Sequence, residues 1–188
     1  MKQRVLIVDD SAFVRRMLSD WVSAQTDMEV VGFATNGADA LGKVKVAKPD
    51  VVTMDVDMPG KDGLQALEEI MREAPTAVIM VSSLTTAGAD KTIRALELGA
   101  LDFVAKPGGA TSLKFLESKE ELLGKIRAAR KASVRRAVHS VAVPTMARQT
   151  TNKVVLIASS TGGPGALSTL FSSLPKGFPA PILMVQHM

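Results

Sequence analysis

The sequence predicts an α/β protein with a doubly wound sheet of five parallel strands, followed by a second, incomplete α/β unit. Two observations predict the first sheet. Five short apolar runs alternate with amphipathic stretches, and most of these runs are apolar throughout, as in strands covered on both faces. Parallel neighbours also need crossover connections, which the intervening helices supply. A renewed strand–helix–strand pattern near the C-terminus predicts the second unit.

The strands of the first block are expected where Val, Ile, Leu and Met cluster in short runs. These runs occupy residues 4–8, 30–34, 51–54, 77–81 and 102–105. Three of the helices between and after them are expected from their apolar periodicity, over residues 38–46, 64–72 and 89–98.

The first and fifth helices carry more specific signals. In the first helix, apolar residues at three- and four-residue spacing are expected to form one buried stripe, made of Phe13, Val14, Met17, Leu18 and Trp21. The fifth helix is expected to begin near Ser118, because Ser118 and Glu121 have the spacing of a capping box. It continues through residue 129.

Charge divides the chain into three parts. Residues 1–118 carry a net charge of −4, residues 119–153 carry +7 and residues 154–188 carry +1. After residue 138 the helical pattern gives way to Ser, Pro, Thr and Gln, which is typical of a linker. We therefore expect one domain, a basic helix end with a linker, and the N-terminal fragment of a second domain, with boundaries at 1–128, 129–152 and 153–188.

The second unit is expected to hold strands over residues 154–158 and 182–185 and a helix over residues 164–174. A unit of this size buries too little surface to form a domain alone. We therefore expect the chain to stop inside its second domain.

Composition excludes several classes of site. The chain has no cysteine, which excludes disulfides, thiolate metal sites and thiol catalysis, and its two histidines argue against a site built from histidine alone. No apolar run approaches the length of a membrane span, and Asp9 and Asp10 interrupt the segment where a signal peptide needs an apolar core. We expect a cytoplasmic protein without membrane insertion.

Polar residues with matching chemistry follow successive strands. Asp9 and Asp10 follow the first strand, Asp55 the third, Ser82 the fourth and Lys106 the fifth. Ligands of open parallel sheets bind at these strand ends, and converging carboxylates suit Mg²⁺. A carboxylate beside a metal and a lysine can attack phosphorus. Each residue alone also fits a helix cap or a loop. Four such features at the ends of strands of one sheet favour a functional site over four unrelated caps and loops.

These residues lie in motifs that resemble the receiver domain of two-component response regulators, a flavodoxin-like fold, over about residues 3–128. The motifs are Val8-Asp9-Asp10-Ser11, Met54-Asp55-Val56-Asp57-Met58-Pro59-Gly60, Val81-Ser82-Ser83 and Phe103-Val104-Ala105-Lys106-Pro107.

The resemblance implies a role for each residue. Asp55 accepts phosphate from a histidine kinase, and Mg²⁺ is held by Asp9, Asp10, Asp55 and the carbonyl of Val56. Lys106 pairs with the phosphoryl group and Ser82 is the switch hydroxyl. Phe103 is the aromatic that turns inward on activation, although ordinary core packing explains a phenylalanine there equally well.

A second motif follows the linker. Ser159 and Ser160 stand between an apolar strand and a turn of Thr-Gly-Gly-Pro, which exposes a hydroxyl near a helix N-terminus. His187 follows the next strand, and parallel strands of one β-α-β unit end at the same edge. Ser160 and His187 are therefore candidates for a nucleophile and its base. A turn serine and a solvated histidine are the simpler explanation of the residues alone.

The combination resembles the chemotaxis protein-glutamate methylesterases, which hydrolyse glutamate γ-methyl esters on chemoreceptors and deamidate glutamine there. The resemblance implies that Ser160 is the nucleophile and His187 its base, with Ser159 as the neighbouring candidate. The family's triad includes a distant aspartate, whereas residues 154–188 contain no Asp or Glu. We therefore expect no appreciable esterase activity from the 188-residue chain itself.

Two other functions fit parts of the sequence. A phosphorylation-controlled binding module, which acts only through receiver surfaces, needs only the first domain. A nucleic-acid-binding regulator is suggested by the +7 segment. That segment contains no aromatic residue and no helix-turn-helix follows it, so a solvated helix face explains the basic run better. We expect no nucleic-acid partner.

Overall fold

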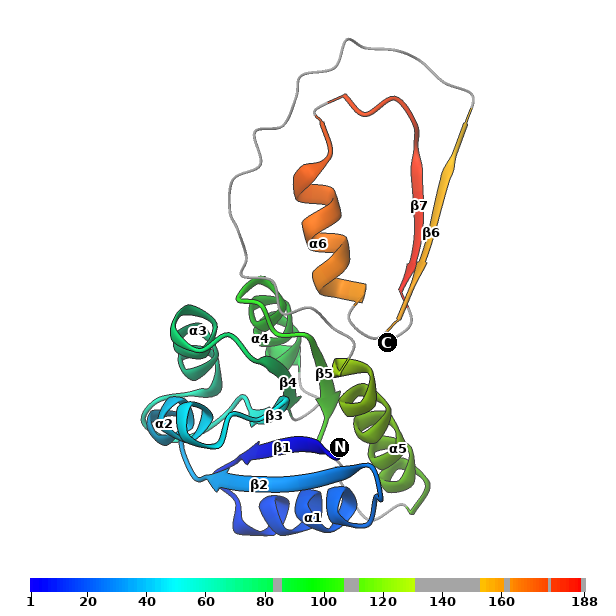
Figure 1. The fold of residues 1–188 in the computed structure, drawn as a ribbon. Coiled ribbons are helices and arrows are strands. Elements are labelled where there is room, and N and C mark those ends of the chain that lie inside the picture. Colours follow the sequence, from blue (N-terminus) through cyan, green and yellow to red (C-terminus); the bar gives the residue numbers. More distant parts are fainter. Residues whose placement is uncertain (83–85, 107–111, 131–152, 161–162, 176, 187–188) are drawn as a thin grey trace.

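The structure is a computed structural model and describes residues 1–82, 86–106, 112–130, 153–160, 163–175 and 177–186 (Figure 1). Most of the expected linker lies outside these ranges. Strands and helices alternate as the sequence predicts. The elements are β1 (Gln3–Val8), α1 (Ala12–Ser23), β2 (Met28–Ala34), α2 (Gly37–Ala47), β3 (Val51–Asp55), α3 (Gly63–Glu73), β4 (Ala77–Ser82), α4 (Thr86–Glu97), β5 (Asp102–Ala105), α5 (Ser112–Ala129), β6 (Val155–Ser159), α6 (Gly163–Ser173) and β7 (Ile182–Gln186).

The first sheet has five parallel strands in the order β2-β1-β3-β4-β5. The order reverses at β1, because the chain adds β2 on one side of it and β3 on the other. Open α/β sheets bind their ligands beyond the carboxyl ends of the strands at such a reversal. Asp9 directly follows β1, and Asp55 is the last residue of β3. The predicted fold class is confirmed.

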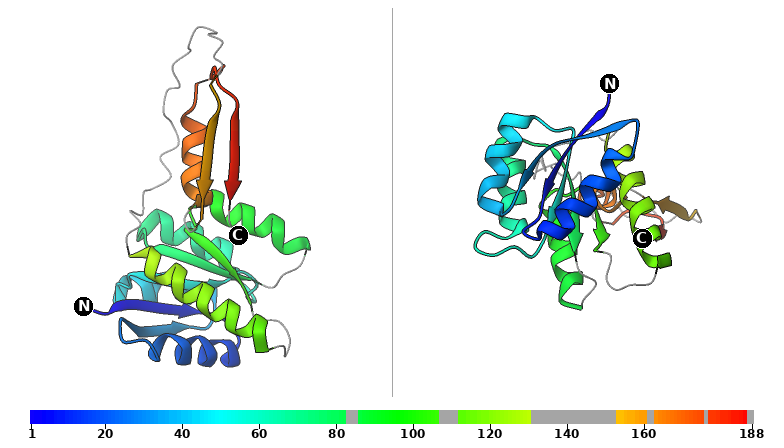
Figure 2. Two further views of the ribbon diagram at one scale, coloured as in Figure 1. Left: turned by 90° about the vertical axis from the view of Figure 1, so that its right-hand side faces the viewer. Right: turned by 90° about the horizontal axis from the view of Figure 1, so that it is seen from below.

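Helices cover both faces of this sheet (Figure 2). The side chains of β1 alternate between the two resulting cores, as the pleat of a strand requires. Leu6 and Val8 belong to the core beneath α2, α3 and α4, whereas Val5 and Ile7 belong to the core beneath α1 and α5. All four are essentially inaccessible to solvent, so the central strands are held rigidly from both sides.

Polar caps start three of the helices at the edge of the sheet where the strands end. Ser11 and Asn36 each accept a hydrogen bond from a backbone N–H in the first turn, capping α1 and α2. At the start of α3, Asp62 and Gln65 form a reciprocal capping box. These caps fix the places where the loops of the site leave the strands.

The expected start of the fifth helix at Ser118 is wrong, because α5 begins well before it. Phe115, in the additional turns, packs edge-on against Trp21 of α1 with ring centroids 5.0 Å apart. Glu121, the expected capping partner, pairs instead with Lys125 one turn later at 2.8 Å. A contact between helices therefore extends α5 past a local capping signal. The other expected elements overlap those observed, with ends that differ by a few residues.

Phe13 does not belong to the buried stripe of α1. Its side chain is 75% exposed, whereas Met17, Leu18 and Trp21 are buried. Phe13 lies in the first turn of the helix, at the rim of the stripe, so spacing alone assigns it to the wrong environment.

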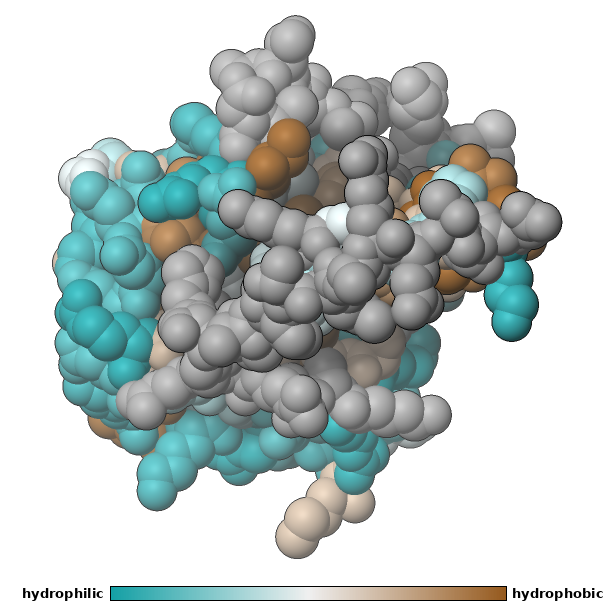
Figure 3. All heavy atoms as spheres, turned by 90° about the horizontal axis from the view of Figure 1, so that it is seen from above, coloured by the Kyte–Doolittle hydropathy of each residue, from teal (hydrophilic) through white to brown (hydrophobic). Residues whose placement is uncertain are grey.

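β6 and β7 pair in parallel along their whole lengths, and α6 connects them in the expected β-α-β unit. α6 lies against α4 and β5 (Figure 1). Leu156 on β6 and Val185 on β7 are 75% and 71% exposed, and hydrophobic side chains are visible on the upper side of the molecule in Figure 3. Among the described helices, none has the length and apolar composition needed to span a bilayer.

Candidate functional site

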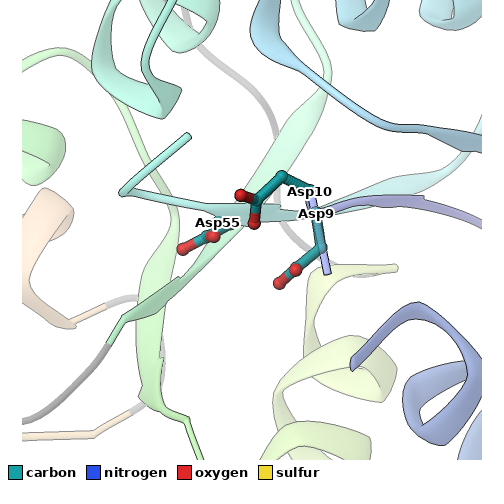
Figure 4. Close-up of side chains that lie close together, drawn as sticks. All are labelled: Asp9, Asp10 and Asp55. Carbon is teal, nitrogen blue, oxygen red and sulfur yellow. The ribbon is translucent and has the colours of Figure 1, made fainter. Parts of the chain in front are cut away.

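Asp9, Asp10 and Asp55 converge at the carboxyl ends of β1 and β3 (Figure 4). One carboxylate oxygen of each lies within 4.8 Å of those of the other two. Asp9 and Asp55 are buried, and Asp10 is exposed. The cluster therefore has two fixed acids beneath one acid that faces solvent, as expected from the positions of these residues after successive strands.

The backbone around Asp55 is tightly connected. Val56 donates its N–H to the carbonyl of Val81 on β4, and its own carbonyl accepts the N–H of Gly63 at 3.0 Å. One carboxylate oxygen of Asp55, Oδ1, accepts the backbone N–H of Asp57 at 3.1 Å. These bonds hold the side chain of Asp55 at the open edge of the sheet.

Lys106 reaches the same point from the end of β5. Its Nζ lies 2.7 Å from Asp55 Oδ2 and 3.1 Å from Asp9 Oδ2. Its backbone N–H donates to the carbonyl of Ser82 at 2.7 Å, which ties the end of β5 to the end of β4. All four strand ends singled out in the sequence, those with Asp9, Asp55, Ser82 and Lys106, are thus connected around one site.

The charges of the site do not balance. Three carboxylates meet one ammonium group, so the cluster carries a net charge of −2 when all four groups are ionised. Burial raises the pKa of Asp55 above its usual value, and the nearby Asp9 carboxylate adds to this rise against the opposing effect of Lys106. Burial alone lowers the pKa of Lys106, but Asp55 and Asp9 outweigh it and the pKa is raised.

The residues present fit a divalent cation. Asp9 Oδ2 and Asp55 Oδ2 are buried and accept no hydrogen bond, although the ammonium of Lys106 lies within ion-pair distance of both. Lys106 supplies only one positive charge, and the negative charge that remains in a partly buried acidic cluster is costly unless another cation neutralises it. All the candidate ligand atoms are oxygens, the donors that Mg²⁺ prefers, and a dication would neutralise the excess charge.

Ser82 and Phe103 lie on β4 and β5, the two strands next after β3 in the sheet. Ser82 is the last residue of β4 and is 6% exposed. Phe103 is partly buried and packs against the core beneath α2, α3 and α4. Its ring centroid also lies 5.1 Å from the ammonium nitrogen of Lys125 on α5, at the distance of a cation–π contact. Phe103 therefore sits between a core and a charged group.

The two serines at the end of β6 differ in their surroundings. Ser159 donates its hydroxyl to Oε1 of Gln186 at 2.5 Å, and Nε2 of the same glutamine donates to the carbonyl of Ser160 at 3.1 Å. Ser160 is exposed, whereas Ser159 is partly buried. His187 lies outside the described residues, so the structure places only one member of the expected serine–histidine pair. Gln186 joins the serine turn to the strand that precedes His187.

Comparison with known proteins follows the two halves of the chain. Residues 5–115 match the family described as response regulator receiver domain, and residues 155–188 match the CheB methylesterase family. The response regulator domain of Thermotoga maritima CheB is 53% identical in sequence, with a TM-score of 0.65 over 71% of this chain and 99% of that one. The chain belongs to the response regulator receiver family. The receiver domain of NarL from Mycobacterium tuberculosis is 31% identical, with a TM-score of 0.56 over 67% of this chain and 97% of that one.

Longer relatives match nearly the whole chain. A protein-glutamate methylesterase/protein-glutamine glutaminase of Thermotoga maritima is 51% identical over 98% of this chain and 55% of its own length. The relative of the same name in Geobacillus kaustophilus is 46% identical over the same shares. The chain thus spans about half the length of the curated relatives that it matches, and it consists of a receiver and the beginning of a CheB methylesterase region.

Two charged contacts of the receiver were not expected from the sequence. Lys125 is buried and pairs with Asp102 at 3.0 Å. Lys91 of α4 pairs with Asp57, two residues after Asp55. The position of Lys125 among the apolar residues of α5 is a signal that could have revealed its burial. Nothing in the local sequence links Lys91 to Asp57, because the two residues belong to separate helical and loop segments.

Proposed function

We propose that the receiver accepts a phosphoryl group on Asp55 in the presence of Mg²⁺. The observation that carries this proposal is the convergence of Asp9, Asp10 and Asp55 with Lys106 at the end of the parallel sheet. The donor would be a histidine kinase of the chemotaxis system, as the resemblance to response regulator receiver domains and to the chemotaxis methylesterases implies.

In this proposal, a carboxylate oxygen of Asp55 attacks the phosphorus of the donor. A bond from that oxygen to phosphorus forms, and the bond between phosphorus and the donor breaks with its electron pair leaving on the donor. Asp9, Asp10, Asp55 and the carbonyl of Val56 would hold Mg²⁺, and the ion would supply positive charge to stabilise the phosphoryl oxygens. Lys106 pairs with Asp55 before the reaction and with one of the phosphoryl oxygens after it, so its ammonium group always has a negatively charged partner.

Phosphorylation would be transmitted through Ser82 and Phe103. The hydroxyl of Ser82 moves toward the new phosphoryl oxygens, and Phe103 turns into the space behind it. The hydrogen bond between Lys106 N–H and the Ser82 carbonyl makes the ends of β4 and β5 respond together. α6 contacts α4 and β5, so a change in these elements alters the surface on which the second unit rests.

The second unit would supply a carboxylic-ester hydrolase in the longer protein. We assign Ser160 as its nucleophile, as the resemblance to the methylesterases implies, and Ser160 is exposed at the end of β6. His187 is its base. The activities would be hydrolysis of glutamate methyl esters and deamidation of glutamine in proteins, as the names of the relatives indicate. The substrates would be methylated chemoreceptors, as the family resemblance implies. The whole would be a cytoplasmic chemotaxis phosphoprotein, divided at 1–128, 129–152 and 153–188.

The test is labelling of the 188-residue chain with acetyl phosphate in the presence of Mg²⁺, read by intact-protein mass spectrometry. The wild-type chain should gain one phosphoryl group, and Asp55→Asn or removal of the metal with a chelator should abolish the gain. Asp39→Asn is the matched control, because Asp39 is an exposed carboxylate in the first turn of α2. Undiminished labelling of Asp55→Asn would refute the proposal.

A second candidate is a binding module that acts without catalysis. The contact of α6 with α4 and β5 favours it, because phosphorylation can then change which surface is exposed even without an ester hydrolase. Small-angle scattering with and without beryllofluoride, a phosphoryl mimic, measures this change in shape. Identical scattering curves would contradict the binding module. They would also contradict the proposal that phosphorylation changes how the second unit rests on the receiver.

A further inference from the structure

We propose that Arg15 is a positioning residue for the metal site, because its guanidinium fixes the turn from which Asp9 and Asp10 project. This inference rests on the proposed function of that site. Arg15 lies in the first turns of α1 and has no carboxylate partner among the ion pairs of the described residues. Its partners are instead two successive peptide carbonyls.

The contacts are specific. Nη1 of Arg15 donates to the carbonyl of Asp9 at 2.8 Å and to the carbonyl of Asp10 at 2.8 Å. Hydrogen bonds from a charged donor are about twice as strong as those between neutral groups. One nitrogen atom therefore holds the two consecutive peptide units whose side chains are the candidate metal ligands.

Other hydrogen bonds hold the residues on either side of Asp10, whereas the carbonyl of Asp10 is held by Arg15. Ser11 donates its N–H to Oδ1 of Asp9 at 2.9 Å, and the N–H of Arg15 donates to the carbonyl of Ser11 at 3.0 Å. Asp9 is also tied to β2, through its N–H and the carbonyl of Ala34 at 3.2 Å. Asp10 is exposed and lies outside β1, so its direction depends on the conformation of the turn.

Electrostatics makes this restraint matter for metal binding. Three like charges within 4.8 Å repel one another, and the repulsion favours any motion that turns Asp10 outward. Part of the binding free energy of a cation is then spent on turning Asp10 back toward the site. Groups that orient metal ligands typically change metal affinity by about 10- to 100-fold when they are removed. Arg15 holds the turn closed before the cation arrives.

The neighbouring arginine provides a matched control. Arg16 is on the same helix with its side chain 81% exposed, and it pairs with Asp20 one turn later at 3.0 Å. Such exposed pairs contribute little to stability. Arg16→Met removes the same charge and the same donor groups as Arg15→Met without affecting the turn.

The experiment compares wild type, Arg15→Met, Arg15→Lys and Arg16→Met in the 188-residue chain. Titration calorimetry with MgCl₂ measures affinity, and labelling by acetyl phosphate is followed as a function of Mg²⁺ concentration. Arg15→Met should raise the Mg²⁺ dissociation constant and the half-saturating Mg²⁺ concentration about 10-fold. The labelling rate at saturating Mg²⁺ should stay within about twofold of wild type, because the ligands themselves remain. Arg15→Lys should lie between the two, and Arg16→Met should match wild type.

The outcomes separate this inference from the proposed function. If wild type binds no Mg²⁺, the proposed function fails and Arg15 has no site to position. If wild type binds Mg²⁺ and Arg15→Met binds it equally tightly, only the role of Arg15 is overturned. A variant whose labelling rate stays low at saturating Mg²⁺, with a lowered unfolding midpoint in metal-free buffer, would show a general structural role and overturn the assignment as well.

Discussion

Gly63 packs directly against the backbone of Asp55. A Cβ atom at Gly63 would lie 2.0 Å from the carbonyl oxygen of Asp55, far inside any permitted contact. The N–H of Gly63 also donates to the carbonyl of Val56, one of the proposed metal ligands. The first residue of α3 therefore requires a hydrogen atom in place of a side chain, because the end of β3 occupies the remaining space.

Gly63→Ala should consequently damage both stability and phosphorylation. The added methyl group must displace the end of β3 or the start of α3, and overpacking of this kind costs about 1–3 kcal/mol. Urea unfolding and acetyl phosphate labelling measure the two effects. Gly42→Ala is the control, since a Cβ atom there meets nothing within 4 Å in the middle of α2. Gly42→Ala should stabilise the chain by about 0.5–1 kcal/mol. Equal unfolding free energies and equal labelling of the two variants would contradict the packing argument.

Asp55→Asn should stabilise the metal-free protein near neutral pH. Because the pKa of Asp55 is raised in the folded state, its stabilising contribution is present below the unfolded value of 3.8 and is lost as the pH rises through the folded pKa. At neutral pH the ionised carboxylate therefore opposes folding, and the amide removes this opposition.

Urea unfolding of both proteins in a chelator, at neutral pH and at successively lower pH, measures the difference. The advantage of Asp55→Asn should shrink as the pH approaches 3.8, and Mg²⁺ should reduce it at neutral pH by stabilising the wild type. A variant that is less stable than wild type at neutral pH without metal would contradict the prediction.

Lys125→Met should destabilise the receiver by about 3 kcal/mol, because it leaves the buried carboxylate of Asp102 without its ammonium partner. The loss of the contact with Phe103 adds to the effect. Arg127→Met, on the same helix, removes a half-exposed pair with Asp27 and an exposed hydrogen bond to Gln25, and it should destabilise the receiver far less. Equal unfolding midpoints in urea for the two variants would show that burial of Lys125 has no energetic role.

The 188-residue chain should show no appreciable hydrolysis of methylated receptors. No carboxylate lies in residues 154–188 to orient the imidazole of His187, and loss of such an orienting group typically reduces turnover on the order of 10⁴-fold. Release of methanol from methylated chemoreceptor is the measurement. A measurable rate that disappears in Ser160→Ala would mean that the chain is already a competent esterase.

The alternation of strands and helices and the positions of the polar strand ends were predictable from the sequence because both depend on local patterns. Asp9, Asp55 and Lys106 follow apolar runs, and a parallel sheet brings such residues to one edge whatever the details of packing. The fold class is confirmed by the structure. The roles of these residues in phosphoryl transfer remain predictions.

Features that depend on contacts between elements were not predictable in the same way. The early start of α5 depends on the contact of Phe115 with Trp21 of another helix. The charge pattern places Lys125 in a solvated basic run, whereas in the structure it lies between Leu122 and Ala129 on the buried face of α5. A lysine is buried only where it has a partner, and the partner of Lys125, Asp102, lies on a different element that the local sequence does not link to it.

The exposed faces of β6 and β7 have a practical consequence for work with this chain. Leu156, Leu183 and Val185 display apolar side chains on a two-stranded parallel pair, and no other strand among the described residues pairs with its outer edges. Concentrated samples should therefore self-associate through edge-to-edge addition. Variants that end near residue 130 should remain dispersed at the same concentration, which light scattering can establish before any spectroscopic study of the acidic cluster.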